Sequence, residues 1–182
     1  MWGTECSPIF ALPHEPRPVL RVSSTARLCV CGQAPGTRVH ASGKPFTDPS
    51  GDRLRAWMGV TAEEFYDAYR VAIVPMGFCY PGRGKSGDLP PRKECAPQWH
   101  KQILSQLPNI ELTLLVGQYA QSFYLSDKPK TLTETVHNWQ RWAPAYFPLP
   151  HPSPRNSLWL KKNSWFEDEV LGALRERVDK VR

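Results

Sequence analysis

Four short apolar runs divide the chain, at residues 28–31, 71–74, 111–116 and 145–149. Each run shows little alternation with polar residues, which is typical of strands that are covered on both faces in a parallel sheet. The pattern therefore predicts four buried strands. The glycine-rich segment GQAPG follows the first of them directly, and the segment HPSPRN comes just after the fourth.

The segments between and after these runs repeat apolar residues every three to four positions, which predicts helices. We expect helices at residues 52–60, 61–69, 93–107, 117–125, 131–142 and 164–181, with Ser50 and Thr61 as the N-caps of the first two. Strands that alternate with helices imply right-handed crossovers. The predicted fold class is therefore α/β: a three-layer α/β/α sandwich with a central four-stranded parallel sheet.

The length of 182 residues, without a long apolar segment, fits one domain over residues 1–182. Residues 1–22 form an N-terminal arm in this interpretation. Both loops, GQAPG and HPSPRN, belong at the same edge of the sheet, because the carboxyl ends of parallel strands lie together. Pro152 and Pro154 fix the backbone around His151 and hold its imidazole in a rigid position, which favours a site at this edge.

Together, GQAPG and HPSPRN resemble the uracil-DNA glycosylase superfamily, whose first motif is a GQDPY or GEAPG type of loop and whose second is an HPSP type of loop. The segments GKPFTDPSGD, FCYPG and LLVGQYA also follow in the family's order, so the resemblance covers most of the chain. It implies the same fold, and a DNA repair enzyme that flips a deaminated base such as uracil out of DNA and hydrolyses its N-glycosidic bond. Free uracil and an abasic site would be the products, and no cofactor would be needed.

The resemblance also implies roles for single residues. His151 would donate a hydrogen bond to the base oxygen as negative charge builds there, and Phe46 would stack on the flipped base. Relatives usually carry a leucine wedge at the position of Arg155, so Arg155 is expected to fill the gap in the duplex, with Leu158 or Trp159 as alternatives. The other candidates for binding the base or the DNA are Gly32, Ala34, Asn156, Ser153, Lys161 and Lys162.

The first motif departs from the family at the positions that handle water. Ala34 stands where GQDPY loops have a water-activating aspartate, and Gln33 stands where GEAPG loops have a glutamate. An amide can orient water but cannot take its proton. Asp48, in a TDPSGD segment that resembles the TGDxSGD segment of a relative family without the first-motif acid, is therefore the first candidate for the missing carboxylate. Asp52 is the second candidate.

Recognition of the base departs from the family as well. Family members commonly read uracil with an asparagine at the end of the second strand, and here Pro75 and Met76 stand in that place. We expect the backbone groups of Met76, Gly77 and Phe78 to contact the base instead. Fewer fixed donors and acceptors discriminate less sharply, so hypoxanthine and xanthine become candidate substrates beside uracil.

Composition bears on the partner and the compartment. A net charge of +6 fits a polyanionic partner such as DNA that contains deaminated bases. Five cysteines and a first segment without the pattern of a signal peptide favour a reducing, cytoplasmic compartment, and no membrane association is expected. We expect the protein to act as a monomer.

The cysteines also raise the question of a metal. Cys79 and Cys95 match the spacing of two cluster ligands in the iron-sulfur glycosylase families. Those families need a further close pair near the N-terminus, where this chain has only Cys6. The sequence therefore predicts no metal, although a site built from Cys6, Cys79, Cys95 and His14 or His100 stays open.

Two other functions also stay open. A DNA-binding module could keep the fold without the chemistry, because both first-motif carboxylates are missing; the presence of His151 argues against this alternative. A flavodoxin-like domain could cradle the phosphate of a nucleotide in GQAPG, but it would have no use for HPSPRN.

Overall fold

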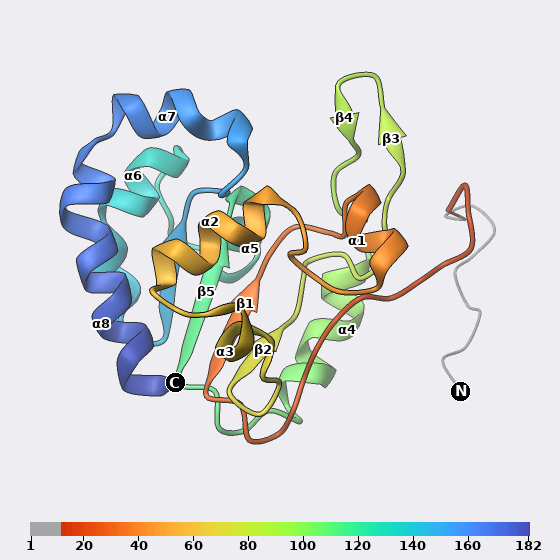
Figure 1. The fold of residues 1–182 in the computed structure, drawn as a ribbon, viewed down its shortest axis with the longest axis horizontal. Helices are drawn as coiled ribbons and strands as arrows, with labels where there is room; N and C mark the ends of the chain where they lie inside the picture. Colours follow the sequence, from red (N-terminus) through yellow and green to blue (C-terminus); the bar gives the residue numbers. More distant parts are fainter. Residues whose placement is uncertain (1–11) are drawn as a thin grey trace.

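The computed structural model describes residues 12–182 and contains one sheet of four parallel strands. The sheet order is β2-β1-β5-β6, and the strands are Leu28–Cys31 (β1), Val71–Ile73 (β2), Leu112–Val116 (β5) and Tyr146–Leu149 (β6). All four lie within the predicted apolar runs. The predicted α/β/α fold is confirmed, and the segments that follow β1 and β6 lie at the same edge of the sheet (Figure 1).

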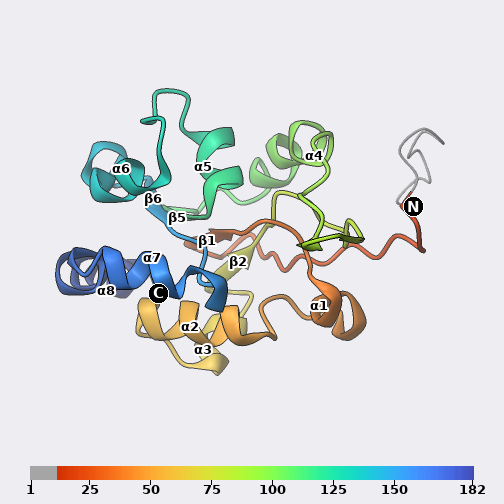
Figure 2. The ribbon, with the colours of Figure 1, turned by 90° about the horizontal axis from the view of Figure 1, so that it is seen from above.

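Helices cover both faces of the sheet (Figure 2). Successive residues of a strand point to opposite faces, so Leu28 and Val30 join one core while Cys29 and Cys31 join the other. The helices that close the first core are α2 (Pro49–Met58), α3 (Ala62–Tyr66) and α8 (Leu171–Val181). Those on the second core are α4 (Cys95–Leu104) and α5 (Gln118–Tyr124).

The remaining elements are short. They are the α-helices Thr37–Ser42 (α1), Leu132–His137 (α6) and Ser157–Lys162 (α7), the 3₁₀ turns Trp139–Trp142 and Pro154–Asn156, and the π-helical turn Phe166–Val170 before α8. A two-stranded hairpin, Arg83–Gly84 (β3) with Gly87–Asp88 (β4), forms a second small sheet. The sequence did not predict α1, α7 or the hairpin, because each is too short to show a repeating apolar pattern.

Side-chain caps begin two of the helices that close the first core. Asp48, and not Ser50 as expected, caps α2: its Oδ1 accepts a hydrogen bond from the N–H of Gly51 at 3.2 Å. Thr61 caps α3 as predicted, in a reciprocal capping box with Glu64. The first of these caps matters for function, because it fixes where the carboxylate of Asp48 lies.

The described part of the N-terminal arm runs beside β2. Arg21 forms an antiparallel bridge with Ile73, and the N–H of Val19 donates to the carbonyl of Phe78 at 2.8 Å. The first eleven residues of the predicted arm, Cys6 among them, lie outside the described residues. None of the helices within residues 12–182 combines the length and the apolar character that crossing a membrane requires.

Candidate functional site

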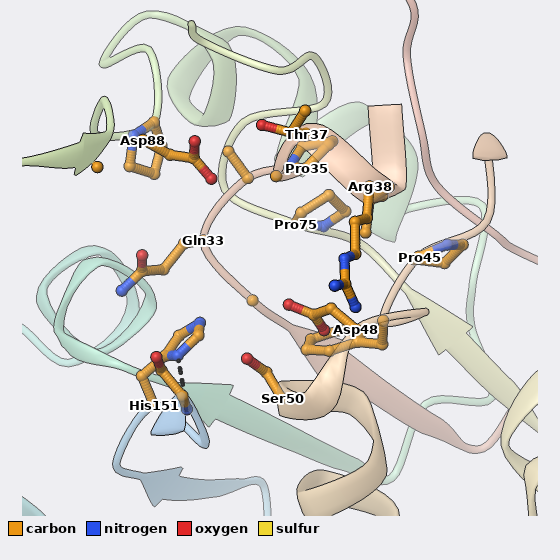
Figure 3. A pocket seen from close by; sticks show the side chains of 18 of the residues that line it. Gln33, Pro35, Thr37, Arg38, Pro45, Asp48, Ser50, Pro75, Asp88 and His151 are labelled. Atoms are coloured by element: carbon orange, nitrogen blue, oxygen red, sulfur yellow. Dashed lines mark hydrogen bonds between the residues drawn. The ribbon is translucent and has the colours of Figure 1, made fainter. Parts of the chain in front are cut away.

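A cavity of about 890 Å³ lies where the loops after β1 and β6 meet (Figure 3). Many of the predicted site residues line it: Gly32, Gln33, Ala34, Phe46, Asp48, His151, Ser153, Arg155 and Asn156. The others lie outside its lining: Asp52, Met76, Gly77, Phe78, Leu158, Lys161 and Lys162. The two motifs are thus brought together from opposite ends of the chain into one site.

His151 lines this cavity, and one nitrogen of its imidazole ring already has a hydrogen-bond partner. Nδ1 lies 3.2 Å from the backbone nitrogen of Ser153. A backbone N–H can only donate, so Nδ1 must accept, and the proton of the neutral ring must lie on Nε2. Burial lowers the pKa of the His151 imidazole, and the charge of Asp48 opposes part of that shift. His151 is therefore a neutral hydrogen-bond donor at neutral pH.

Three hydrogen bonds hold the loop that carries His151. The side-chain amide of Asn156 donates to the carbonyl of His151 at 2.7 Å, and Arg53 of α2 donates to the carbonyl of Ser153 at 3.1 Å. The hydroxyl of Ser153 accepts from the N–H of Arg155 at 3.3 Å. Asn156, which was expected to contact the base, lines the cavity, but its side-chain amide donates a hydrogen bond within this loop. Arg53, which the sequence did not single out, joins α2 to the HPSPRN segment.

Asp48 enters the cavity from the N-terminus of α2, next to Pro49 at the first helical position. Its Oδ1 accepts the capping hydrogen bond from Gly51, and within residues 12–182 its Oδ2 has no hydrogen-bond partner. The charge of Asp48 raises the pKa of His151, and the carboxylate and the imidazole line the same cavity. One carboxylate oxygen is thus fixed by the helix and the other is available to a ligand or to water.

Asp52, the second candidate for the water-activating carboxylate, is directed away from the cavity. It lies one turn into α2, its side chain is 78% exposed, and it forms an ion pair with Arg55 at 2.6 Å. The cap at Asp48 accounts for this placement, because a residue four positions after the N-cap cannot share the cap's position at the end of the helix. The structure therefore favours Asp48 over Asp52.

Phe46 lines the cavity in a backbone conformation that is rare for an aromatic residue, with φ of 56°. The hydroxyl of Tyr66 donates to the carbonyl of Phe46 at 2.9 Å, and Arg55 donates to the same oxygen at 3.2 Å. A Cβ added to Gly32 would lie 2.9 Å from Cζ of the ring, so the aromatic side chain packs directly on that glycine. Strained residues that are held by their surroundings gather at functional sites.

Gln33 lies beside His151 at the start of α5. A Cβ on Gly117, which has φ of 87°, would lie 3.2 Å from Nε2 of Gln33 and 3.5 Å from Cβ of His151. Figure 3 shows the amide of Gln33 and the ring of His151 on the same wall of the cavity. Gln33 therefore lies in the cavity with His151, as the sequence predicted. Its amide can orient a ligand or a water molecule but cannot accept a proton from it.

The backbone N–H groups that were expected to contact the base, those of residues 76–78, donate to other partners within the protein. The N–H groups of Met76 and Gly77 donate to the carbonyls of Gly32 and Gln33 at 2.9 and 2.8 Å. The N–H of Phe78 donates to Sγ of Cys95 at 3.4 Å. These backbone donors tie the end of β2 to the first loop and to α4, so they do not face a base. Pro75 lines the cavity in their place.

Five polar residues of the cavity were not predicted as site residues. They are Thr37 and Arg38 of α1, Ser50 of α2, and Arg83 and Asp88 of the β3–β4 hairpin. Ser50 is buried and was expected as a cap. Asp88 accepts a hydrogen bond from the hydroxyl of Tyr80 at 3.1 Å and lies against Gly36 of the first loop. The four residues other than Ser50 lie on α1 and the hairpin, which the apolar pattern did not predict.

The predicted DNA contacts lie on the loop after β6 and on α7, which follows it. Nη1 of Arg155 donates to the carbonyl of Ser86 in the hairpin at 3.2 Å. Leu158, the alternative wedge, is 71% exposed on α7, while Trp159 donates from its indole to Thr133 and packs on the core. The other predicted contacts are two exposed lysines in the last turn of α7, Lys161 and Lys162.

The metal site that the sequence left open is not assembled among the described residues. No group of three or more His, Cys, Asp or Glu side chains gathers there in a way that could hold a metal ion. Both ring nitrogens of His100 are engaged, with the hydroxyl of Tyr124 at 2.6 Å and the carbonyl of Pro75 at 2.9 Å. Cys6, which that hypothesis also requires, lies outside the described residues.

Comparison with known protein families gives a match over most of the chain. Residues 20–175 match the model of the uracil DNA glycosylase superfamily. The matched range contains every residue that lines the cavity except Val19.

Proposed function

The chain belongs to the uracil DNA glycosylase superfamily, and from this membership we infer that it is a DNA glycosylase that hydrolyses the N-glycosidic bond of uracil in DNA. We propose hypoxanthine and xanthine as further substrates. The reaction releases the free base, uracil in the first case, and leaves an abasic site in the strand. The observation that carries the proposal is that His151, Asp48 and Gln33 line one cavity.

The target base must leave the stack to reach this cavity, because its glycosidic bond is not accessible inside a duplex. Phe46 supports the proposal as a stacking surface: it lines the cavity and packs on Gly32, with its carbonyl held by Tyr66. Stacking on an aromatic ring is worth about 1–3 kcal/mol per base in other nucleic-acid complexes and depends little on base identity. Arg155 at the mouth would occupy the space that the base leaves.

His151 would stabilise the leaving base. As the glycosidic bond breaks, negative charge builds on the base, and a donor fixed in place before the reaction lowers the energy of that state. Because Nδ1 accepts from Ser153, the Nε2–H is the group left to donate to a carbonyl oxygen of the base. The lowered pKa of His151 keeps the ring neutral, so it donates a hydrogen bond without carrying a positive charge.

Asp48 would act on the other half of the transition state, the sugar that becomes cationic. Its carboxylate stabilises that positive charge and can orient or deprotonate the attacking water through the oxygen that the α2 cap leaves available. Gln33 would help to orient the same water through its amide. This division of roles replaces the first-motif carboxylate that the chain lacks at Gln33 and Ala34.

The dimensions and the lining of the cavity support a broad choice of base. A volume of about 890 Å³ lies near the upper end of ligand sites and leaves room for a purine. Family members read uracil with an asparagine, and here the backbone donors at that place are committed elsewhere. A pocket with few fixed partners for the base discriminates weakly. Action as a monomer and a cytoplasmic location stay predictions from the sequence.

The test is an incubation with end-labelled oligonucleotides that each carry a single uracil, hypoxanthine or xanthine, in single and double strands. The reaction contains a chelator and no nucleotide, and abasic sites are then cleaved with alkali. We expect cleavage at uracil and at one or both of the purines. Intact strands at high enzyme excess, with DNA binding retained, would instead support a binding module of the same fold.

A further inference from the structure

The β3–β4 hairpin rises beyond the sheet at the edge where the loops after β1 and β6 lie, and α7 stands on the opposite side of these loops (Figure 1). Each of its strands has only two residues, and Lys85 and Ser86 form the turn between them. Arg83, Lys85 and Ser86 are exposed. A ribbon this short adds no core to the fold, so its side chains are available to a partner.

The positive charges of the hairpin are not neutralised within the described residues. Arg83 pairs in the ladder with Asp88, yet the carboxylate of Asp88 accepts a hydrogen bond from the hydroxyl of Tyr80 and forms no ion pair with Arg83 among the described residues. Neither Arg83 nor Lys85 forms an ion pair with any residue of the range 12–182. Two cations on a projecting ribbon therefore have no ion-pair partner among residues 12–182, an arrangement suited to an anionic ligand.

The hairpin is also connected to the cavity. Arg83, Gly87 and Asp88 line it, and the hydrogen bond from Arg155 to the carbonyl of Ser86 joins the hairpin to the HPSPRN segment. The guanidinium of Arg155 packs so closely on Gly87 that a Cβ there would collide with it. The hairpin and the loop after β6 thus form a continuous rim around the cavity.

We propose that the β3–β4 hairpin is a DNA-backbone contact, in which Arg83 and Lys85 bind phosphates on the side of the cavity opposite α7. The inference rests on the proposed function. Lys161 and Lys162 lie in the last turn of α7, which stands on the side opposite the hairpin (Figure 1). An enzyme that rotates a nucleotide out of a duplex must hold the backbone on both sides of it, and phosphate contacts supply that hold without reading sequence.

The test compares two double variants that lose the same charge. Arg83→Gln/Lys85→Gln removes the hairpin cations. Lys101→Gln/Lys180→Gln removes two exposed cations at the opposite edge of the sheet: Lys101 lies in the last turn of α4, and the carbonyl of Lys180 accepts from Arg27, just before β1. The measurement is the dissociation constant for a duplex with a stable abasic-site analogue, by fluorescence anisotropy over a series of salt concentrations.

The hairpin variant should bind at least about fivefold more weakly, and its slope of log K against log salt should be smaller by about 1.8, since each phosphate contact contributes about 0.9. The control variant should keep the slope of the unmodified protein. Arg83→Lys/Lys85→Arg, which preserves both charges, should restore the slope, and a matching thermal unfolding curve would exclude a loss of structure.

An unchanged slope and affinity in the folded hairpin variant would overturn the inference, as would an equal loss in the control variant. Failure of the proposed function looks different. An unmodified protein that binds the duplex in a salt-dependent manner but releases no base contradicts the glycosylase and leaves the hairpin comparison intact.

Discussion

The backbone N–H of Ser153 donates to Nδ1 of His151 at 3.2 Å. This contact spans only two residues, and the prolines at 152 and 154 fix the turn that makes it. It places the single N–H of the neutral ring on Nε2. It also disfavours the doubly protonated ring, because a proton on Nδ1 would face the N–H of Ser153. Burial acts in the same direction, since it lowers the pKa of His151.

The first prediction concerns pH. In the proposed mechanism the neutral ring is the active form, so the single-turnover rate of base release should stay level as the pH falls to about 6.5, the ordinary pKa of histidine, and should decrease only below it. Asp48→Asn removes the charge that raises the pKa of His151, so its decrease should begin at a still lower pH. ¹⁵N NMR of the imidazole should show the proton on Nε2. A rate that rises as the pH falls through 6.5 would mean that the charged ring is the donor.

The pKa of His151 also predicts how stability depends on pH. A histidine whose pKa is lowered in the folded state takes up a proton first in the unfolded chain as the pH falls. The free energy of unfolding should therefore decrease as the pH falls below about 6.5, and the contribution of His151 should level off below its folded pKa. Denaturant unfolding of the unmodified protein and of His151→Asn across this range measures the contribution. Identical pH dependence in the two proteins would contradict the lowered pKa.

The third prediction separates the two carboxylates of α2. Asp48→Asn should lower the single-turnover rate by about a hundredfold or more, in the range typical of a lost general acid or base. Asparagine caps helices as well as aspartate, so the fold should be kept. Asp52→Asn is the matched control and should remain nearly fully active, because Asp52 is exposed and pairs with Arg55.

Gln33→Ala belongs to the same series and should cost roughly tenfold, as the loss of one neutral hydrogen bond in the transition state. Binding of a duplex with an abasic-site analogue should survive all three changes. An active Asp48→Asn beside an inactive Asp52→Asn would reverse the assignment. Full activity in both would leave the chemistry to His151 and to the phosphates of the DNA.

The fourth prediction uses two glycines. A methyl group on Gly32 would lie 2.9 Å from the ring of Phe46, so Gly32→Ala must displace the ring and should reduce base release at least about tenfold if stacking of about 1–3 kcal/mol depends on it. Gly172 of α8 has nothing within 4 Å of an added methyl group, so Gly172→Ala should keep activity and gain about 0.4–1 kcal/mol of stability. Rates and denaturant unfolding of both variants test this pair. A fully active Gly32→Ala would contradict the proposed stacking of the base on Phe46.

The fifth prediction concerns Arg155. Its guanidinium donates to the carbonyl of Ser86, and a side chain that enters the duplex as a wedge must leave that contact. Arg155→Ala should therefore weaken binding to a duplex more than binding to a single strand, where no gap in a stack has to be filled. Arg53 holds the same loop from α2 through Ser153. Equal losses on duplex and single strand would make Arg155 a simple phosphate contact.

The sequence predicted the sheet and much of the cavity, because both depend on local pattern. The apolar runs identify the strands, and Gln33 and His151 lie directly after β1 and β6, where a parallel sheet collects its ligand-binding groups. The role of Asp48 as the N-cap of α2 could also have been predicted from the sequence. Aspartate followed by Pro49 is a common helix start, and it would have identified the cap in place of Ser50.

The roles that the sequence missed depend on contacts between distant segments. The N–H groups of Met76 and Gly77 are paired with the first loop, more than forty positions earlier, and no local pattern reveals that pairing. The amide of Asn156 turns back to its own loop instead of toward the base. Asp88 reaches the cavity only because the hairpin folds over Gly36.

The measurement that tests the central claim most directly is quantification of the released base by mass spectrometry, from a duplex with one uracil and with the enzyme in excess. The account predicts one free uracil per duplex and a matching abasic strand. His151→Ala should slow the release by about 10²–10⁴-fold, the contribution typical of a positioned acid or base. Release of no base by the unmodified protein, or release at the same rate by His151→Ala, would contradict the account.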